Sequence, residues 1–227
     1  MRRPFLSWLA PLLLLLPLAP AATAAQQWIA GRNYFLIEPP LPTNLPPGKV
    51  EVTEVFSYAC PACNAFYPVA DRLRESLPAN AVMDFVPAAF NPSEDWPVFQ
   101  RAYFAAKALG IAAKTHDAVF NAVWQSGELA VYNKLTETLR DPLPTIEDLA
   151  SFYHRTTGVS TQKFLATANS FAVNLDMRRA RSYVIAAQVD GTPTIIVNGK
   201  YRVTVTSAGG YDQVIELVNW LVAKENR

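Results

Sequence analysis

Hydrophobic residues recur along the chain with two different periods, one that predicts strands and one that predicts helices. Residues 49–58 alternate between apolar and polar positions, which is typical of a β-strand. One face of this strand carries Val50, Val52, Glu54, Phe56 and Tyr58. Short apolar runs predict further strands over residues 34–37, 82–87, 194–197 and 201–205. The last two flank Asn198-Gly199, a dipeptide that predicts a hairpin with a type I′ turn.

A helical period governs most of the remaining chain. Directly after the first long strand, the apolar positions at helical spacing are Phe66, Ala70, Leu73 and Leu77. In the middle of the chain, helices are predicted over residues 98–109, 115–125, 128–140, 146–156, 162–168 and 171–187. Thr145 and Ser160 stand at N-cap positions of two of these helices. A last amphipathic helix, with one face suited to cover a sheet, is predicted by Val214, Leu217, Val218, Leu221 and Val222.

The order of these elements predicts an α/β fold that is interrupted by a block of helices. The strand, helix and strand over residues 49–87 predict two parallel strands joined by a right-handed crossover. We expect residues 26–92 to form the first part of the α/β domain, 93–180 an inserted helical domain, and 181–227 the second part of the α/β domain.

The first residues have the order of charge and hydropathy that is typical of a secretory signal peptide. Arg2 and Arg3 precede the apolar, leucine-rich stretch 9–22, and small residues follow it. Prolines interrupt this stretch, which is shorter than the roughly 20 apolar residues of a membrane-spanning helix. We therefore expect residues 1–25 to be a signal peptide that is cleaved after Ala24 or Ala25. Arg2-Arg3 also resembles a twin-arginine export signal, and both export routes lead out of the cytosol.

Composition excludes several classes of protein. Of the 227 residues, 51% are hydrophobic and only 17% are charged, so the chain can form a large core and is not intrinsically disordered. The formal net charge is +1, which provides no field that would attract a polyanion. We therefore expect no nucleic-acid partner.

The two cysteines carry the clearest chemical signal. Cys60 and Cys63 form a Cys-x-x-Cys motif between a predicted strand and a predicted helix, and Pro61 suits the first helical turn. At a helix N-terminus the backbone N–H groups and the helix dipole stabilise a thiolate. Outside the cytosol, such a pair can persist as a disulfide. The motif therefore indicates thiol–disulfide redox chemistry.

Two alternatives to redox chemistry stay open for this motif. Cys-x-x-Cys can be half of a zinc site, but a structural site needs four ligands, and His116 and His154 lie far from the pair in the sequence. We expect both histidines to be solvated or partly packed helix residues, and we expect no metal site. An inert structural disulfide is the second alternative, although closing so short a loop stabilises a fold poorly.

Two motifs together resemble the DsbA family of periplasmic thiol:disulfide oxidoreductases, which have a thioredoxin fold with an inserted helical domain. The sequence EVTEVFSYACPAC at 51–63 matches the active-site motif, and DGTPTIIVNGKY at 190–201 matches a second motif in the correct order. About 130 residues separate Cys63 from Pro193, and this length fits the helical insertion of the family.

The resemblance implies roles for individual residues. Cys60 would be the nucleophile that forms a mixed disulfide with substrate, and Cys63 the buried resolving cysteine. Pro193 would be the cis-proline that faces the cysteines, and the backbone of Thr192 would pair with an extended substrate segment. Glu54 would be the buried acid that exchanges a proton with Cys63. The alternatives are an ordinary strand-edge proline at 193 and a surface carboxylate at 54.

The chain departs from the family pattern at two places. The dipeptide between the cysteines is Pro61-Ala62, whereas Pro-His is the commonest in the family. Because Ala62 lacks the imidazole that helps to hold the thiolate, we expect Cys60 to be acidic but less so than in a Pro-His relative. The segment 128–144 is longer than the family norm, and its sequence indicates no role.

The resemblance implies a periplasmic, monomeric enzyme that donates its Cys60–Cys63 disulfide to reduced exported proteins and needs no other cofactor. A DsbB-type membrane quinone reductase would reoxidise it. A disulfide reductase or isomerase of the same fold is one alternative. A soft-metal-binding module is another, although the chain has only three methionines as soft co-ligands. A chaperone or peptide-binding module without redox turnover is a further alternative.

Overall fold

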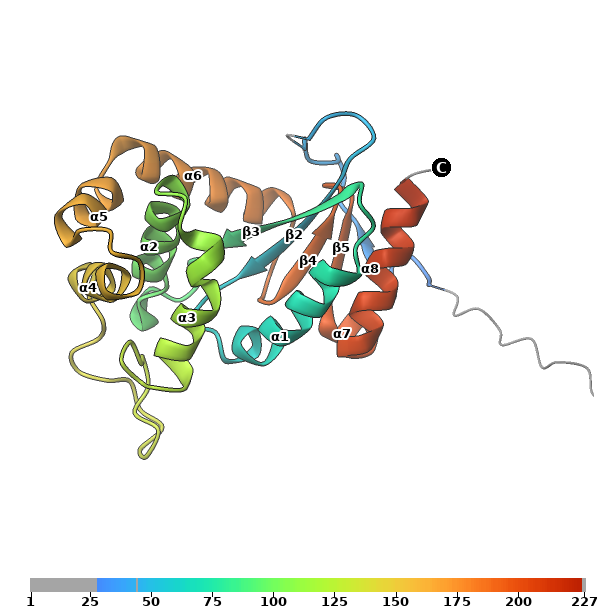
Figure 1. Ribbon diagram of the computed structural model, residues 1–227. Coiled ribbons are helices and arrows are strands. Elements are labelled where there is room, and N and C mark those ends of the chain that lie inside the picture. Colours follow the sequence, from blue (N-terminus) through green and yellow to red (C-terminus); the bar gives the residue numbers. More distant parts are fainter. Residues whose placement is uncertain (1–27, 44, 226–227) are drawn as a thin grey trace, which may run out of the picture.

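The structure is a computed structural model that describes residues 28–43 and 45–225. The predicted signal peptide, residues 1–25, and its cleavage site lie outside the described residues. The core of the fold is a five-stranded sheet with strand order β1-β5-β4-β2-β3 (Figure 1). Its strands are β1 (Phe35–Leu36), β2 (Val50–Phe56), β3 (Ala81–Pro87), β4 (Thr194–Val197) and β5 (Tyr201–Thr204). Every predicted strand is present, with ends that differ by a few residues.

The pairing of the central strands brings distant parts of the sequence to one edge of the sheet. β2 and β3 are parallel and are joined by α1 (Pro61–Ser76), as the predicted crossover requires. β4 runs antiparallel to β2, and Thr194 at its start pairs with Val55 near the end of β2. The end of β2 leads to Cys60, so the residues just before β4 lie beside the cysteine motif.

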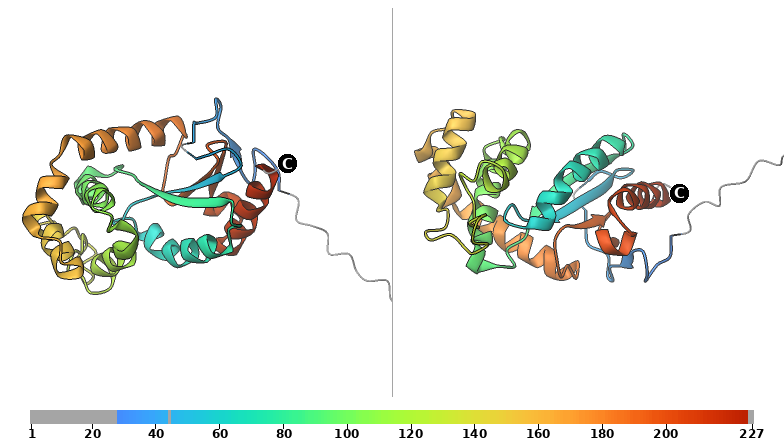
Figure 2. Two further views of the ribbon diagram at one scale, coloured as in Figure 1. Left: turned by 45° about the horizontal axis from the view of Figure 1, so that its top comes forward. Right: turned by 90° about the horizontal axis from the view of Figure 1, so that it is seen from below.

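Helices cover both faces of the sheet (Figures 1 and 2). One face packs against α1 and the C-terminal helix α8 (Tyr211–Glu225), with Val52, Leu73 and Leu217 fully buried between them. The other face packs against α6 (Phe171–Ala186), where Val184 contacts the cluster that contains Val55.

The helices between β3 and α6 form a block beside the sheet (Figure 2). They are the short 3₁₀ helix Pro92–Glu94, α2 (Trp96–Ala108), α3 (Ala112–Trp124), α4 (Ile146–Thr157) and α5 (Thr161–Ala168). The predicted caps Thr145 and Ser160 are confirmed, since each side chain accepts a hydrogen bond from the first turn of its helix. α6 links the block to the sheet, so the predicted domain division at residue 180 falls within this helix.

The prediction of a helix over residues 128–140 is wrong. This segment forms turns and one isolated antiparallel bridge between Tyr132 and Leu139. The side chain of Asn133 accepts hydrogen bonds from the N–H groups of Leu135 and Thr136 at 2.9 and 3.4 Å. A local side-chain bond of this kind offers the backbone an alternative to helical pairing, and short-range hydrophobic spacing does not reveal it.

The end of the predicted hairpin also differs from the prediction. The last strand stops at Thr204, and Val205 begins the short helix α7 (Val205–Ala208), which the hydrophobic pattern did not reveal. Thr204 and Ser207 form a reciprocal capping box, which starts the helix at this point. The type I′ turn itself is supported by the positive φ angles of Asn198 and Gly199, 52° and 64°.

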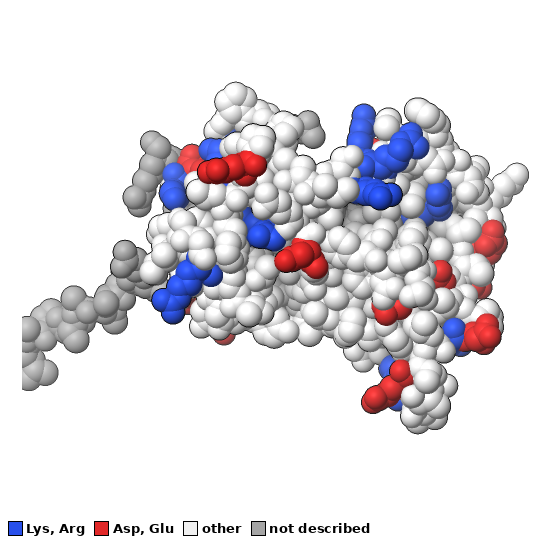
Figure 3. All heavy atoms as spheres, turned by 180° about the vertical axis from the view of Figure 1, so that it is seen from behind, with Lys and Arg blue, Asp and Glu red and all other residues white. Residues whose placement is uncertain are grey.

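Charged side chains are sparse on the face in Figure 3, and most of that surface is uncharged. One group of basic side chains gathers at its upper edge, on the side of the helical block, and acidic side chains lie elsewhere on the face. None of the helices over residues 28–43 and 45–225 combines the length and the apolar character that crossing a bilayer requires.

Candidate active site

The structure places Cys60 at the N-cap of α1. Its backbone is extended, and its sulfur accepts a hydrogen bond from the N–H of Cys63 at 3.4 Å. Pro61 occupies the first helical position, where the missing N–H is not needed. The backbone groups that a helix start leaves unpaired therefore point toward the sulfur of Cys60, as the sequence predicts.

This environment makes the Cys60 thiol acidic. A hydrogen bond from the Cys63 thiol is the largest influence, and it lowers the pKa of Cys60 together with the Thr192 side chain and the N–H groups of Cys63 and Ala62. These donors outweigh the opposing effect of burial and bring the pKa to about 6. At neutral pH, Cys60 is therefore mainly a thiolate, which is the nucleophilic form of the residue.

The second cysteine has the opposite character. Cys63 is fully buried, and burial raises the pKa of its thiol, with further contributions from the hydrogen bond and charge of Cys60 and from Glu54. Cys63 therefore keeps its proton while Cys60 is charged. The motif thus combines a nucleophile that is 6% exposed with a fully buried partner that can attack the same sulfur.

The peptide bond between Thr192 and Pro193 is cis, as the resemblance implied. The Thr192 carbonyl oxygen lies 3.5 Å from the Cys60 sulfur and accepts a hydrogen bond when Cys60 is in its thiol form, so the loop lies beside the sulfur. The Thr192 hydroxyl is buried and makes no hydrogen bond of regular geometry with the described residues. Next to this loop lies a groove of about 400 Å³, whose lining includes Ala62, Gly191, Pro193, Thr206 and Tyr211.

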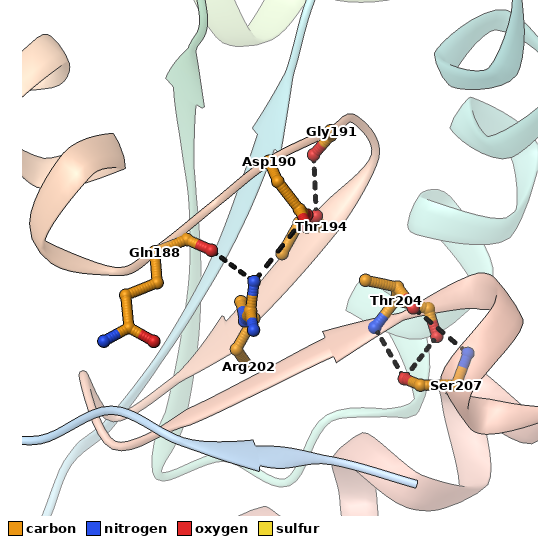
Figure 4. A network of polar contacts seen from close by, with 7 residues as sticks. All are labelled: Gln188, Asp190, Gly191, Thr194, Arg202, Thr204 and Ser207. Carbon is orange, nitrogen blue, oxygen red and sulfur yellow. Dashed lines mark hydrogen bonds and ion pairs between the residues drawn. The ribbon is translucent and has the colours of Figure 1, made fainter. Parts of the chain in front are cut away.

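A polar network holds the loop that leads to Pro193 (Figure 4). The guanidinium of Arg202, on β5, donates a hydrogen bond to the Gln188 carbonyl and lies 3.6 Å from the Asp190 carboxylate. The Thr194 hydroxyl donates to the Gly191 carbonyl at 2.7 Å and closes the turn. The loop is therefore held from a neighbouring strand and from its own end, which keeps the Thr192 carbonyl beside Cys60.

Glu54 lies on the face of β2 that packs against α1. Its side chain belongs to a residue that is 1% exposed, so the surface-carboxylate alternative is wrong. Burial is the largest of the effects that raise its pKa to about 8, and the charges of Asp71 and Cys60 add to it. Glu54 is therefore protonated at neutral pH, and its Oε2 atom has no hydrogen-bond partner among the described residues. A buried neutral carboxyl can give or take a proton.

Comparison with known proteins identifies the family. A family model described as Thioredoxin matches residues 46–217. The thiol:disulfide interchange protein DsbA of Pseudomonas aeruginosa is 36% identical over 204 residues, which cover 90% of this chain and 89% of that protein. DsbA of Azotobacter vinelandii is 33% identical over 198 residues, covering 86% and 83%. The chain belongs to the DsbA family.

Solved structures agree with this assignment. The crystal structure of Pseudomonas aeruginosa DsbA matches with a TM-score of 0.73 and 36% identity, over 87% of this chain and 94% of that one. The oxidoreductase DsbA from Xylella fastidiosa matches with a TM-score of 0.76 and 32% identity, over 87% and 97%. The predicted fold class, a thioredoxin-like α/β fold with inserted helices, is confirmed. This DsbA-family chain is a protein disulfide oxidoreductase.

The prediction for the environment of His116 in this DsbA-family protein is wrong. His116 is not a solvated or partly packed residue: it is 8% exposed and lies among aromatic rings, and its Nδ1 is 2.9 Å from the Tyr58 hydroxyl. Burial lowers the pKa of His116 to about 4, with a smaller contribution from Arg74, so the ring is neutral. His154 is exposed, as predicted.

The support of the active-site loop from the helical block was also missed. The indole N–H of Trp124, at the end of α3, donates to the Tyr58 carbonyl at 2.8 Å, two residues before Cys60. The residues in this bond and in the Arg202 network are far apart in sequence, and no local pattern marks them. Throughout the described part of the chain, no group of three or more His, Cys, Asp or Glu side chains is placed to hold a metal ion.

Proposed function

We propose that this protein is a periplasmic oxidase that donates its Cys60–Cys63 disulfide to reduced exported proteins. The observation that carries the proposal is the unequal state of the two sulfurs: Cys60 is stabilised as a thiolate, and Cys63 is buried and protonated. A stabilised thiolate favours the reduced form of the pair, so the disulfide is the better oxidant. Each pKa unit on Cys60 corresponds to about 1.4 kcal/mol, or roughly 30 mV for this two-electron couple.

The reaction begins with a thiolate of the client. It attacks the sulfur of Cys60, which breaks the Cys60–Cys63 bond and forms a mixed disulfide between client and enzyme. Cys63 leaves as a thiolate and takes a proton that the carboxyl of Glu54 supplies, because a charged sulfur at this buried position is costly. Glu54 then recovers a proton from solvent.

A second client thiolate completes the transfer. It attacks the client sulfur of the mixed disulfide, and Cys60 leaves as the stabilised thiolate. The client gains a disulfide and loses two electrons and two protons; the enzyme gains the electrons, keeps one proton on Cys63 and leaves the other in solvent. A membrane quinone reductase of the DsbB type returns the pair to the disulfide.

The cis-proline loop orients the client in this proposal. Thr192 and Pro193 line the groove beside Cys60, where an extended client segment can add as a short strand and pair with the backbone of Thr192. The network around Arg202 keeps this edge in place. The leader pattern of residues 1–25 supports export, and the oxidising compartment maintains the disulfide.

Oxidation of a reduced, unfolded ribonuclease by the mature protein tests the proposal. We expect Cys60→Ser to abolish the oxidation of the client, because the attacked sulfur is absent. Cys63→Ser should accumulate a mixed disulfide that is visible on a non-reducing gel. Gln162→Ala, at an exposed position on α5 in the helical block, is the control and should behave as the unmodified protein.

The redox equilibrium with glutathione, measured on the same preparation, separates the alternatives. A strongly reducing potential together with reduction of insulin would replace the oxidase by a reductase. Rescue of scrambled ribonuclease without net oxidation would indicate an isomerase. Retention of peptide binding and of all measured activity in Cys60→Ser would indicate a binding module.

A further inference from the structure

The segment between α3 and α4 forms a projection that the proposed reaction does not use. We call residues 132–139 the arm. Its two sides meet at the Tyr132–Leu139 bridge, and the N–H of Asn133 donates to the Thr138 carbonyl at 2.8 Å. The arm extends beyond the helices in Figure 1 and stands out at the lower right of the surface in Figure 3. It is therefore a defined, narrow element with most of its surface in solvent.

The base of the arm is held firmly. Leu129 and Val131 are buried in the core of the helical block. The ammonium group of Lys134 donates to the Gln125 carbonyl, and the guanidinium of Arg140 donates to the Gly127 carbonyl, both at 3.0 Å. These contacts fix the direction in which the arm leaves the protein.

The arm starts at the rim of the active site. Trp124 binds the Tyr58 carbonyl, and its indole ring lies 6.4 Å from the ring of Tyr132, measured between centroids. Tyr132 in turn lies close to Glu94 and within the electrostatic reach of Cys60. Its pKa is raised to about 12, first by burial, then by Glu94 and then by the charge of Cys60. The base of the arm therefore lies at the rim of the active site, beside the Trp124 side chain that holds the loop before Cys60.

Exposed apolar side chains lie at the base and at the tip of the arm. Leu139 is 41% exposed and lies opposite Tyr132 across the bridge, so the two side chains share one face. Leu135, at the tip, is 94% exposed. A single exposed leucine is ordinary on a protein surface. Here, however, Trp124, Tyr132 and Leu139 adjoin one another at the base of the arm, and Leu135 adds an exposed apolar side chain at its tip.

We propose that the arm is a second contact for the reduced client, and that it holds an extended apolar segment near the client cysteine that reacts with Cys60. This inference rests on the proposed oxidase function. The occupant follows from position and chemistry. The base of the arm lies at the rim of the active site, and its exposed leucines are apolar, whereas the groove beside Pro193 has a threonine-rich lining. Cysteines are among the most buried residues of folded proteins, so in an unfolded client they are flanked by exposed apolar side chains.

The test compares two substrates on the variant Leu135→Ser/Leu139→Ser. We expect its second-order rate for the oxidation of reduced, unfolded ribonuclease to fall about tenfold, from the loss of partial burial of two leucines. The rate with dithiothreitol and the pKa of Cys60 should be unchanged, since a small dithiol does not reach the arm. Leu135→Ser alone, at a nearly fully exposed position, should show a smaller loss without any risk to folding.

The matched control is Leu36→Ser/Phe171→Ser, which removes two exposed apolar side chains elsewhere on the surface and should retain both rates. An unchanged client rate in the arm variant would overturn the inference and leave the oxidase function intact. An equal loss with dithiothreitol would also overturn it, because the arm would then act on the sulfur chemistry itself.

Other occupants give different results. If only reoxidation by inner-membrane vesicles falls, the arm contacts the membrane oxidant and the inference is wrong. If the arm variant changes the oligomeric state, measured by light scattering, and the client rate is retained, the arm contacts a second copy. If the unmodified protein does not oxidise the client at all, the proposed function fails together with this inference.

Discussion

Glu54 and His116 are buried titratable groups in two regions of the molecule, and they differ in whether the side chain has a hydrogen-bond partner. Glu54 lies between the sheet and α1, and His116 lies in the helical block. Burial keeps both uncharged at neutral pH, since it raises the pKa of the acid and lowers that of the base. His116 has the Tyr58 hydroxyl as a partner at 2.9 Å, whereas Glu54 Oε2 has none in the described part of the chain.

The difference shows that burial alone does not mark a functional group. A paired polar group in the interior contributes to one defined packing arrangement, and its loss leaves the partner unsatisfied. A buried carboxyl with an unpaired oxygen near a reactive sulfur carries a cost in stability and remains available for proton transfer. Substitution of Glu54 should therefore stabilise the protein at neutral pH, and substitution of His116 should destabilise it.

Glu54→Gln should have the largest effect on stability. The folded carboxyl keeps its proton up to about pH 8, while the unfolded one loses it near pH 4.5, so native stability falls as pH rises through this window. The difference in pKa corresponds to about 5 kcal/mol, which glutamine does not incur. Urea unfolding from pH 4 to pH 9 should show the variant gaining stability relative to the unmodified protein as pH rises.

The same variant should slow the oxidation of a client, because the proton for Cys63 is no longer supplied by residue 54. The rate with client at neutral pH measures this loss. The stability of the two proteins could instead depend on pH in the same way, and the rate could be unchanged. Glu54 would then have no role in proton transfer that His116 lacks.

His116→Phe should act in the opposite direction. The Tyr58 hydroxyl loses its partner, so the variant should be less stable by about 1–3 kcal/mol at pH 7. In the unmodified protein the folded ring resists protonation down to about pH 4, and stability is lost as pH falls from 6.5 to 4, by about 3 kcal/mol. Phenylalanine does not titrate, so denaturant unfolding should show a smaller acid dependence.

The oxidation rate provides the control for this second substitution. The pH dependence of client oxidation by His116→Phe should match that of the unmodified protein, because His116 pairs with Tyr58 and not with a sulfur. A shifted pH profile would show that the helical block takes part in the proton transfer.

Ala62→His should have the smallest effect, at an exposed position beside the nucleophile. An imidazole at the start of α1 adds a donor toward the Cys60 sulfur, so we expect the pKa of Cys60 to fall by about one unit and the disulfide to become more oxidising by about 30 mV. Thiolate absorbance against pH and the equilibrium with glutathione measure the two shifts. Ala62→Asn, which is polar but does not titrate, is the control. An unchanged pKa would show that Cys63, Thr192 and the backbone N–H groups hold the thiolate without help from residue 62.

Several features of the site could be predicted because they depend on neighbours in the sequence. The alternation over 49–58 predicted which face of β2 carries Glu54, and Pro61 predicted the helix that starts after Cys60. The helix predicted over 128–140 failed for a local reason of another kind. Asn133 binds the backbone with its side chain, and apolar spacing does not detect such a bond.

The sequence alone indicated the order of the elements and the redox motif. The signals were the hydrophobic periodicity, the helix caps and the spacing of the cysteines. Only the tertiary structure determined that Arg202 supports the loop before Pro193, that His116 pairs with Tyr58, and that Tyr132 at the base of the arm lies beside Trp124. The physical reason is the separation in sequence between the residues that interact. A helix or strand depends on residues a few positions apart, whereas these contacts join residues whose distance depends on strand register and on the packing of the helical block against the sheet.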